Sequence, residues 1–387
     1  MDRLRLRVEQ FRTVEDLALL PILERDQIQR DPEYFLSTAP AKLPHRTERS
    51  SGSTGVPVTV FWDWASWLRT LARRERATLT VRRLAGRRNH RATLIAVLPV
   101  AMEGISMLRD GTLIPARLRP IQQRLSSLDP PELNIERMNE FRPDVVVAFG
   151  SYVDACFRYL EAYPRDFHRP KAIVYASDAL PEPTRRRVVE GFGIPVVAGY
   201  QAVEAHPIAF GCGRGSSMHV NIDINPVRIV GRSDESLAVD ETGDIIVSNL
   251  ENRASVILNY RIGDLAALLS ERCSCGRTLP LLSRIQGRRG DWFELTGGVS
   301  IPPQEIEIEL TPETEIMRWQ LVQVAPDLIR VSLLCRPSCD KEALRLRLEA
   351  RLVRVFRGLA RVETQFVDRF GQSPSGKFHA FVPLSRR

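Results

Sequence analysis

The sequence predicts an α/β protein in which a large N-terminal domain precedes a small C-terminal α+β domain. Between Asp144 and Tyr200, continuous apolar strands alternate with helices, a pattern typical of a mostly parallel, helix-flanked sheet. From about residue 217 the strands become shorter and polar or glycine-containing turns separate them, which indicates a β-rich subdomain. The last 95 or so residues contain strands around one charged helix, enough for a modest core of their own.

In the parallel region we expect strands at 144–149, 171–176 and 194–199, and helices at 152–163 and 183–192. Ligands of such sheets collect beyond the carboxyl ends of the strands. The residues that follow Phe149, Ala176 and Gly199 are therefore candidate site residues.

The flanking elements follow from the same patterns. A strand at 58–62 leads into a helix with Asp63 as its N-cap, and a further strand is expected at 92–100. The β-rich part should contain strands at 218–223, 227–230, 244–249 and 255–260. The small domain should contain strands at 328–335 and 362–367 and a helix at 341–356. We predict domains at 1–288 and 292–387, joined by a hinge at 289–291.

Composition restricts the class of protein. A chain of 387 residues with 43% hydrophobic residues can bury a substantial core, so disorder is not expected. The formal net charge of +8 favours the binding of anions in general. Aromatic residues, which would stack on nucleic-acid bases, are not interleaved with the arginines. Solvated helix faces therefore explain the charge better than a nucleic-acid groove, which stays an alternative. With no apolar leader and no membrane-spanning run, we expect a cytoplasmic protein with neither nucleic acid nor membrane as partner.

A Ser/Gly-rich stretch, residues 50–57, is the strongest local signal. It holds four hydroxyl residues and two glycines and ends in a proline. Glycine lets the backbone approach a ligand closely, successive amide N–H groups can form an anion nest, and hydroxyls add donors without charge. A plain connector is an equally good interpretation of these residues alone. The stretch lacks the Gly-Lys-Ser/Thr ending of the common nucleotide P-loop.

Residues 50–57 resemble the phosphate loop of the adenylate-forming enzymes, which reads Ser/Thr-Ser-Gly-Ser/Thr-Thr-Gly-x-Pro. Further stretches resemble motifs of that family's phenylacetate–CoA ligase branch in the same order along the chain: 175–181, 199–204, 259–264, 287–291 and 373–377. The chain departs from the family pattern at Val58, Gln201, Val203 and Thr296. The resemblance implies the adenylate-forming fold, in which the small domain is mobile.

The resemblance also implies roles for individual residues. Contacts to ATP would come from Ser50, Ser51, Gly52, Ser53, Thr54, Gly55, Ser177, Asp178, Tyr200, Asp264 and Arg288. Asp264 would accept hydrogen bonds from the ribose hydroxyls, a task that suits an acceptor-only carboxylate. Glu204 would help to hold Mg²⁺, and Asp291 would be the hinge. Lys377 would stabilise the charge that develops as the acid attacks the α-phosphate.

The reaction implied is ATP-dependent activation of a carboxylic acid, with an aromatic acid favoured. The acid would lie in a pocket that includes Phe149, Gly150, Gln201 and Ala202. Coenzyme A is the favoured acceptor of the acyl group, and an amine or a carrier-protein thiol is an alternative. A degenerate protein that binds an adenylate without catalysis is a second alternative, favoured by the departures at Gln201, Val203 and Thr296.

Cysteine and histidine residues in the β-rich part form a candidate zinc set: Cys212, His219, Cys273 and Cys275. Three thiolates and an imidazole suit tetrahedral Zn²⁺. The Cys-x-Cys spacing is tighter than the usual Cys-x₂-Cys, so ordinary reduced thiols stay a second interpretation.

Overall fold

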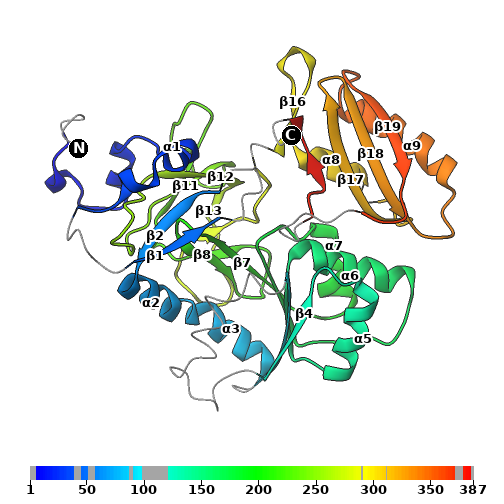
Figure 1. The fold of residues 1–387 in the computed structure, drawn as a ribbon, viewed down its shortest axis with the longest axis horizontal. Coiled ribbons are helices and arrows are strands. Elements are labelled where there is room, and N and C mark those ends of the chain that lie inside the picture. Colours follow the sequence, from blue (N-terminus) through cyan, green and yellow to red (C-terminus); the bar gives the residue numbers. More distant parts are fainter. Residues whose placement is uncertain are drawn as a thin grey trace. The chain divides into compact units, whose positions relative to one another are not determined.

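The computed structural model describes residues 6–38, 45–50, 57–86, 90–97, 121–288, 291–310, 312–370 and 378–384. The chain folds into two compact units (Figure 1). The first comprises Met1–Leu79 and Ala198–Ile285, and the second comprises Thr80–Val197 and Gln286–Arg387. The chain enters the second unit just before the predicted hinge at 289–291. Residues 289 and 290 lie outside the described part, so the hinge and the predicted domain boundaries stay predictions.

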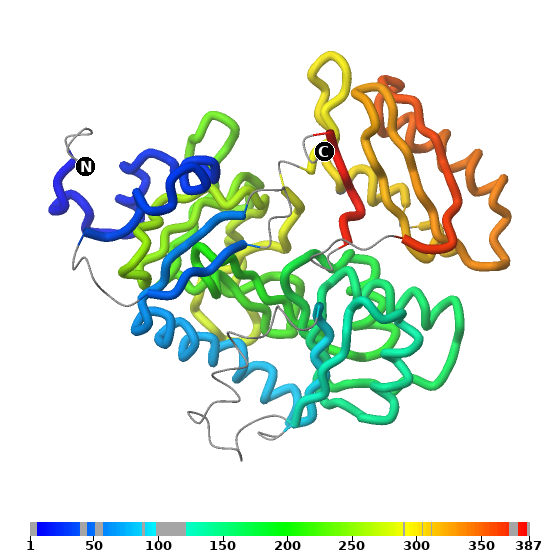
Figure 2. The backbone as a smooth tube through the Cα atoms, viewed as in Figure 1, coloured from blue at the N-terminus to red at the C-terminus, as the bar shows by residue number. Residues whose placement is uncertain are grey.

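The first unit begins with short helices and an antiparallel hairpin. The 3₁₀ helices η2 (Val8–Gln10), η3 (Glu15–Leu19) and η4 (Pro32–Phe35) flank helix α1 (Arg25–Arg30). Strands β1 (His45–Arg49) and β2 (Thr59–Asp63) pair in antiparallel register and run side by side in Figure 2. Helix α2 (Trp64–Arg73) follows, and the Asp63 carboxylate accepts from Ser66 N–H as the predicted N-cap.

Two groups of antiparallel strands complete the first unit. One has the order β13 (Leu268–Leu269), β14 (Leu281–Leu282), β9 (Met218–Val220), β8 (His206–Gly211) and β7 (Val196–Ala202), which begins in the second unit. The other has the order β10 (Val227–Val230), β11 (Gly243–Val247) and β12 (Tyr260–Ala266). The predicted strand at 255–260 is wrong, because β12 begins where that strand was expected to end. Ser255 instead uses its hydroxyl to accept from Phe61 N–H on β2.

The second unit contains the predicted parallel sheet. Its strands are β3 (Arg91–Ala96), β4 (Ile121–Ser126), β5 (Val145–Ala148) and β6 (Ala172–Ala176), in the order β6-β5-β3-β4. All three pairings are parallel. Its helices are α3 (Glu75–Ala85), which starts in the first unit, α5 (Pro131–Phe141), α6 (Gly150–Ala162) and α7 (Glu182–Arg186), which continues as the π-helical turn η7 (Arg187–Gly191).

The C-terminal part of the second unit is the predicted small α+β fold. Its sheet has the order β19 (Arg361–Phe366), β18 (Leu328–Cys335), β17 (Ile316–Ala325) and β20 (Phe381–Val382). Helices α8 (Pro303–Leu310) and α9 (Lys341–Val355) and the hairpin β15 (Phe293–Glu294)–β16 (Ser300–Ile301) accompany it.

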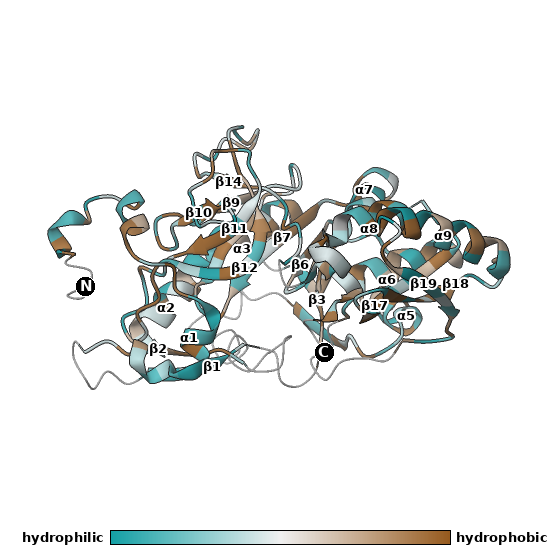
Figure 3. Cartoon of the chain, turned by 90° about the horizontal axis from the view of Figure 1, so that it is seen from above, coloured by the Kyte–Doolittle hydropathy of each residue, from teal (hydrophilic) through white to brown (hydrophobic). Residues whose placement is uncertain are grey.

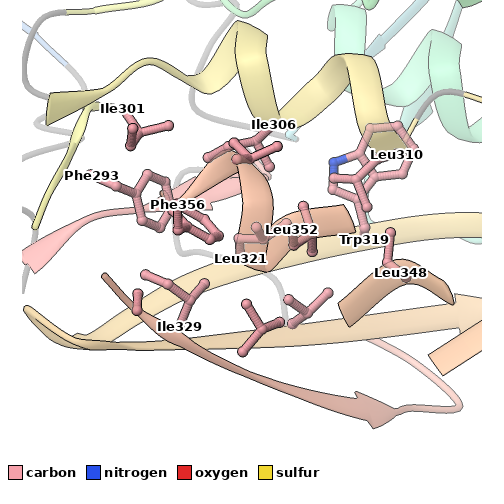
Figure 4. Packing of buried hydrophobic residues seen from close by; sticks show 14 of the residues in the cluster. Phe293, Ile301, Ile306, Leu310, Trp319, Leu321, Ile329, Leu348, Leu352 and Phe356 are labelled. Atoms are coloured by element: carbon pink, nitrogen blue, oxygen red, sulfur yellow. The ribbon is translucent and has the colours of Figure 1, made fainter. Parts of the chain in front are cut away.

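One apolar cluster forms the core of this small fold. Leu348 and Leu352 of α9 meet Leu321 of β17 and Ile306 of α8, all fully buried (Figure 4). Hydrophilic residues alternate with hydrophobic ones along α9 (Figure 3), as expected for a helix with one face in a core. Within the described residues, no helix is long and apolar enough to cross a bilayer.

Candidate functional site

The β1–β2 hairpin frames the Ser/Gly-rich stretch. Residues 51–56, which include the predicted phosphate contacts Ser51, Gly52, Ser53, Thr54 and Gly55, lie outside the described residues. The two ends of the stretch are described and close on each other. Ser50 N–H donates to the Val58 carbonyl at 2.9 Å, and Val58 N–H donates to Ser50 Oγ at 2.8 Å. The chain therefore leaves and re-enters the hairpin at one place, as a ligand loop on a rigid stem would require.

Glu204 lies in the turn between β7 and β8 and is 3% exposed. The hydroxyl of Tyr260 donates to its Oε1 at 2.9 Å. Two further bonds hold the turn itself, since Trp62 Nε1 donates to the Val203 carbonyl at 3.0 Å and Asn249 Nδ2 donates to the Glu204 carbonyl at 2.9 Å. Because Trp62 belongs to β2, the turn that carries Glu204 and the stem of the Ser/Gly loop are directly joined.

The structure also brings together two of the predicted nucleotide contacts. Tyr200, at the end of β7, donates its hydroxyl to Asp264 Oδ2 at 2.8 Å. Asp264 is 6% exposed and lies on β12, four residues after Tyr260. It is thus held within a strand. One strand therefore positions both the Glu204 and the Tyr200 side chains. Gln201 is exposed and Ala202 is half-buried.

In the second unit, four candidate residues cluster at the ends of β5 and β6. Phe149 is half-buried and precedes Gly150, the first residue of α6. A Cβ atom on Gly150 would lie 2.5 Å from the carbonyl carbon of Ala179, so only glycine fits. Ser177 has a φ of 76°, in the left-handed region. This turn orients Asp178, whose carboxylate accepts from Ser151 Oγ at 2.5 Å and from Ser151 N at 3.3 Å, capping α6.

The remaining predicted residues lie near the C-terminal part. Arg288 and Asp291 are half-buried, and Asp291 N–H donates to the Arg288 carbonyl at 2.9 Å. Lys377 lies outside the described residues. Its role, like that of the loop residues, stays a prediction.

The candidate zinc ligands converge in the first unit. Cys212 follows β8, His219 lies on β9, and Cys273 and Cys275 lie in the loop after β13. Cys212 Sγ is 3.5 Å from Cys273 Sγ, and Cys275 Sγ is 3.3 Å from His219 Nε2. All four donor atoms lie within 4.8 Å of one another. A tetrahedron with Zn–S bonds of about 2.3 Å has S–S edges of roughly 3.8 Å, so the donor set fits zinc.

The electrostatics of this cluster differ from thiol to thiol. Burial raises the pKa of Cys212 to about 11. Burial acts in the same direction on Cys275, but the backbone N–H and the guanidinium of Arg277 overcome it and lower the pKa of that thiol to about 7. Arg277 Nη1 lies 3.2 Å from Cys275 Sγ. Thiolate is the form that binds metal, so Cys275 is prepared for this chemistry.

Sequence reasoning missed several residues that shape these sites. Tyr260 lies inside a motif stretch but had no predicted role. Its hydroxyl is the hydrogen-bond donor that the buried carboxylate of Glu204 requires. Arg277 follows the Cys-x-Cys pair by two residues, a position from which a cation can act on the thiols. Asn249 and Trp62 have no sequence signal that would have found them, because their partners lie far along the chain.

Comparison with solved structures defines the class first. No family model matches the chain. 2-Hydroxyisobutyryl-CoA ligase, in a postadenylation complex with an acyl-AMP, matches 99% of this chain and 84% of its own with a TM-score of 0.76 and 17% identity. The o-succinylbenzoate-CoA synthetase of Bacillus subtilis, solved with AMP, covers 86% of this chain and 67% of its own with a TM-score of 0.55 and 18% identity. The chain has the fold of the adenylate-forming CoA ligases, and the predicted fold class is confirmed.

Sequence comparison then identifies the branch. The phenylacetate-coenzyme A ligase of Thermus thermophilus is 24% identical over 323 residues, 81% of this chain and 70% of that protein. The enzyme of the same name from Escherichia coli K12 is 22% identical over 315 residues, 78% of this chain and 68% of that protein. The chain is phenylacetate–CoA ligase-like, as its motifs predicted.

Proposed function

We propose that this chain is an acid–thiol ligase that works in two half-reactions. In the first, a carboxylate oxygen attacks the α-phosphorus of ATP, and pyrophosphate leaves as the acyl-adenylate forms. In the second, the thiol of coenzyme A attacks the acyl carbonyl, and AMP leaves. The names of the relatives support this reaction. The observation in the molecule that carries it is the placement of Tyr200, Glu204 and Asp264 around β12, joined to the stem of the Ser/Gly loop.

Each residue has a distinct role in this proposal. Asp264 accepts hydrogen bonds from the ribose, and the Tyr200 hydroxyl keeps that carboxylate oriented until the nucleotide arrives. Glu204 would hold Mg²⁺, which supplies charge neutralisation on the phosphates; the Tyr260 hydroxyl fixes the carboxylate for that task. The loop Ser51–Gly55 binds the β/γ-phosphates and Lys377 the developing negative charge. Arg288 contacts the ribose or phosphate, and Asp291 acts as the hinge.

The acid and the acceptor are the finer parts of the proposal. An aromatic acid suits a pocket with Phe149 beside Gly150, where a larger residue would meet the Ala179 backbone. Coenzyme A is the proposed acceptor, and a carrier-protein thiol or an amine would use the same first half-reaction. We also propose that the protein is cytoplasmic.

The test is pyrophosphate–ATP exchange across a panel of aromatic and aliphatic acids. A carboxylate-activating enzyme incorporates labelled pyrophosphate into ATP with at least one acid and prefers aromatic members of the panel. A degenerate adenylate-binding protein shows exchange with none. Adding coenzyme A, a carrier protein or an amine to the active acid then distinguishes the acceptors.

We also propose that Cys212, His219, Cys273 and Cys275 hold a structural Zn²⁺. Protein purified without chelator should contain about one zinc per chain. Cys273→Ser should lower this content strongly, whereas Cys156→Ser, a buried thiol on α6, should not. A chain that contains no zinc under these conditions would defeat the assignment.

A further inference from the structure

The turn that carries Glu204 ends at a histidine with an uncommon backbone conformation. His206 is the first residue of β8 and has a φ of 53°, in the left-handed region that residues with a Cβ atom seldom adopt. Such a conformation costs free energy and persists only where the surrounding contacts hold it. The backbone just before it is well held, since Ala205 N–H donates to the Ala202 carbonyl at 3.2 Å and Asn225 Nδ2 donates to the Ala205 carbonyl at 2.8 Å.

The imidazole of His206 is buried and is contacted by residues of separate elements. Its Nε2 lies 2.8 Å from Oε2 of Glu48 on β1. Its Nδ1 lies 3.1 Å from Nη2 of Arg74, which follows α2. The ring also lies against the indole of Trp62 on β2, with the two ring centroids 4.5 Å apart. These contacts fix the place and the direction of the ring, and with it the backbone at which the turn ends.

Glu48 connects this histidine to the β1–β2 hairpin. Its second carboxylate oxygen, Oε1, accepts from Trp67 Nε1 of α2 at 3.1 Å. With one oxygen towards an indole and the other towards the imidazole, the carboxylate has a fixed orientation. The hairpin therefore holds the turn at its start and at its end. Trp62 Nε1 donates to the Val203 carbonyl at the start, and Glu48 contacts His206 at the end.

We propose that His206 and Glu48 are a positioning pair for the candidate metal ligand Glu204. The inference rests on the proposed function, in which Glu204 helps to hold Mg²⁺, an ion that prefers carboxylate oxygens. The Tyr260 hydroxyl orients the carboxylate itself, whereas the pair fixes the backbone from which the side chain extends. Both residues of the pair lie outside the motif stretches, and neither contacts the metal or the nucleotide.

The test measures how much Mg²⁺ strengthens ATP binding. Calorimetric dissociation constants of ATP are measured for the full-length protein with saturating Mg²⁺ and again with a chelator, and their ratio is the gain that the metal provides. General damage to the nucleotide site weakens ATP in both conditions and leaves the ratio unchanged. A displaced Glu204 lowers the ratio.

We expect Glu204→Gln to lose most of the gain. His206→Asn suits a left-handed backbone but is shorter than the imidazole, so it should lower the gain about 10-fold, as loss of an outer supporting group commonly does. His206→Gln, which keeps a donor towards Glu48, should fall between this variant and the wild type. Glu48→Gln should also lower the gain, since its amide no longer offers two acceptor oxygens. The matched control is His45→Gln, at an exposed position on the same strand as Glu48, and it should leave the gain unchanged.

An unchanged gain in folded His206→Asn and Glu48→Gln proteins would overturn the inference and leave the proposed function in place. Equal weakening of ATP with and without Mg²⁺ would do the same, because it would show a structural role alone. A gain that survives Glu204→Gln would remove this residue as a metal ligand, and the pair with it. A wild type that binds no ATP in either condition would overturn the proposed function as well.

Discussion

Tyr260 and Glu204 form a buried polar pair in the candidate site. Both side chains are nearly inaccessible, and the phenol supplies the donor that the carboxylate needs. An unsatisfied buried acceptor costs more free energy than an average hydrogen bond contributes. The pair therefore makes a stability prediction that does not depend on the proposed reaction.

We expect Tyr260→Phe to lower the free energy of unfolding by about 1–3 kcal/mol, because it removes the hydroxyl and leaves the carboxylate buried. Urea denaturation of the full chain measures the change. Tyr34→Phe is the control, since Tyr34 is 77% exposed and should change stability by less than about 0.5 kcal/mol. Equal losses in the two variants would show that the hydroxyl of Tyr260 contributes nothing specific.

His206 begins β8 and is enclosed by charged groups. Its Nδ1 lies 3.1 Å from Arg74 Nη2, and because a guanidinium only donates, this nitrogen accepts. The proton therefore sits on Nε2, which lies 2.8 Å from the Glu48 carboxylate. Arg46 also pairs with Glu48, at 3.1 Å. Burial lowers the pKa of His206 below its usual value, and Glu48 opposes this only in part.

This pKa shift predicts a loss of stability on acidification. As the pH falls through about 6.5, the unfolded chain takes up a proton on this histidine before the folded chain does, so unfolding is favoured. His206→Gln keeps a donor towards Glu48 and cannot be protonated. The melting temperature of this variant should fall less than that of the wild type between about pH 7.5 and 5.5. His45→Gln, at an exposed position, is the control, and an identical decline in all three proteins would contradict the argument.

At the scale of elements, periodicity predicted strands well where one pattern dominated. β10 and β18 lie where they were expected, and the N-cap at Asp63 is confirmed. β8 was missed because nearly every residue of it is buried and Pro207 interrupts it, so no alternation is visible. The strand predicted to end at Tyr260 was wrong, because the side chains of Asn252 and Ser255 form hydrogen bonds with the backbone of β2. Such contacts join residues more than a hundred positions apart and leave no local signal.

Helix α9 allows a matched test of the small fold. Leu348 is fully buried in its core, whereas Leu346 on the same helix is 57% exposed. Leu348→Ala should destabilise this part of the chain by about 2–5 kcal/mol, through lost burial and the cavity left behind. Leu346→Ala should lower the free energy of unfolding by well under about 1 kcal/mol, because this side chain is exposed. Hydrogen exchange of β17 and β18 reports the difference, and equal exchange in both variants would contradict the packing described.

The candidate zinc ligands come from elements that are far apart along the chain. Because its ligands follow β8, lie on β9 and follow β13, a bound metal should hold these strands together. Removing metal with a chelator should raise hydrogen exchange in β8 and β9 and leave α9, in the other unit, unchanged. Equal hydrogen exchange in β8 and β9 before and after chelation would argue against a structural metal.

At the scale of the whole molecule, the order of the motifs was the most informative property of the sequence. It predicted the fold class and the phenylacetate–CoA ligase-like branch, both confirmed by the comparisons. It did not predict which groups support the motif residues. Tyr260 and Asn249 were not assigned because their roles arise from tertiary contacts made by residues far apart along the chain.

Lys377 provides the most direct test of the central claim, that the front and the tail of the chain act on one nucleotide. Pyrophosphate–ATP exchange is measured with the best acid for the wild type, Lys377→Ala and the control Lys341→Ala at the start of α9. We predict that Lys377→Ala slows exchange about 100- to 1,000-fold, as expected for loss of a group that stabilises the transition state, with unfolding and the control unchanged. Exchange at the wild-type rate in Lys377→Ala would contradict the account.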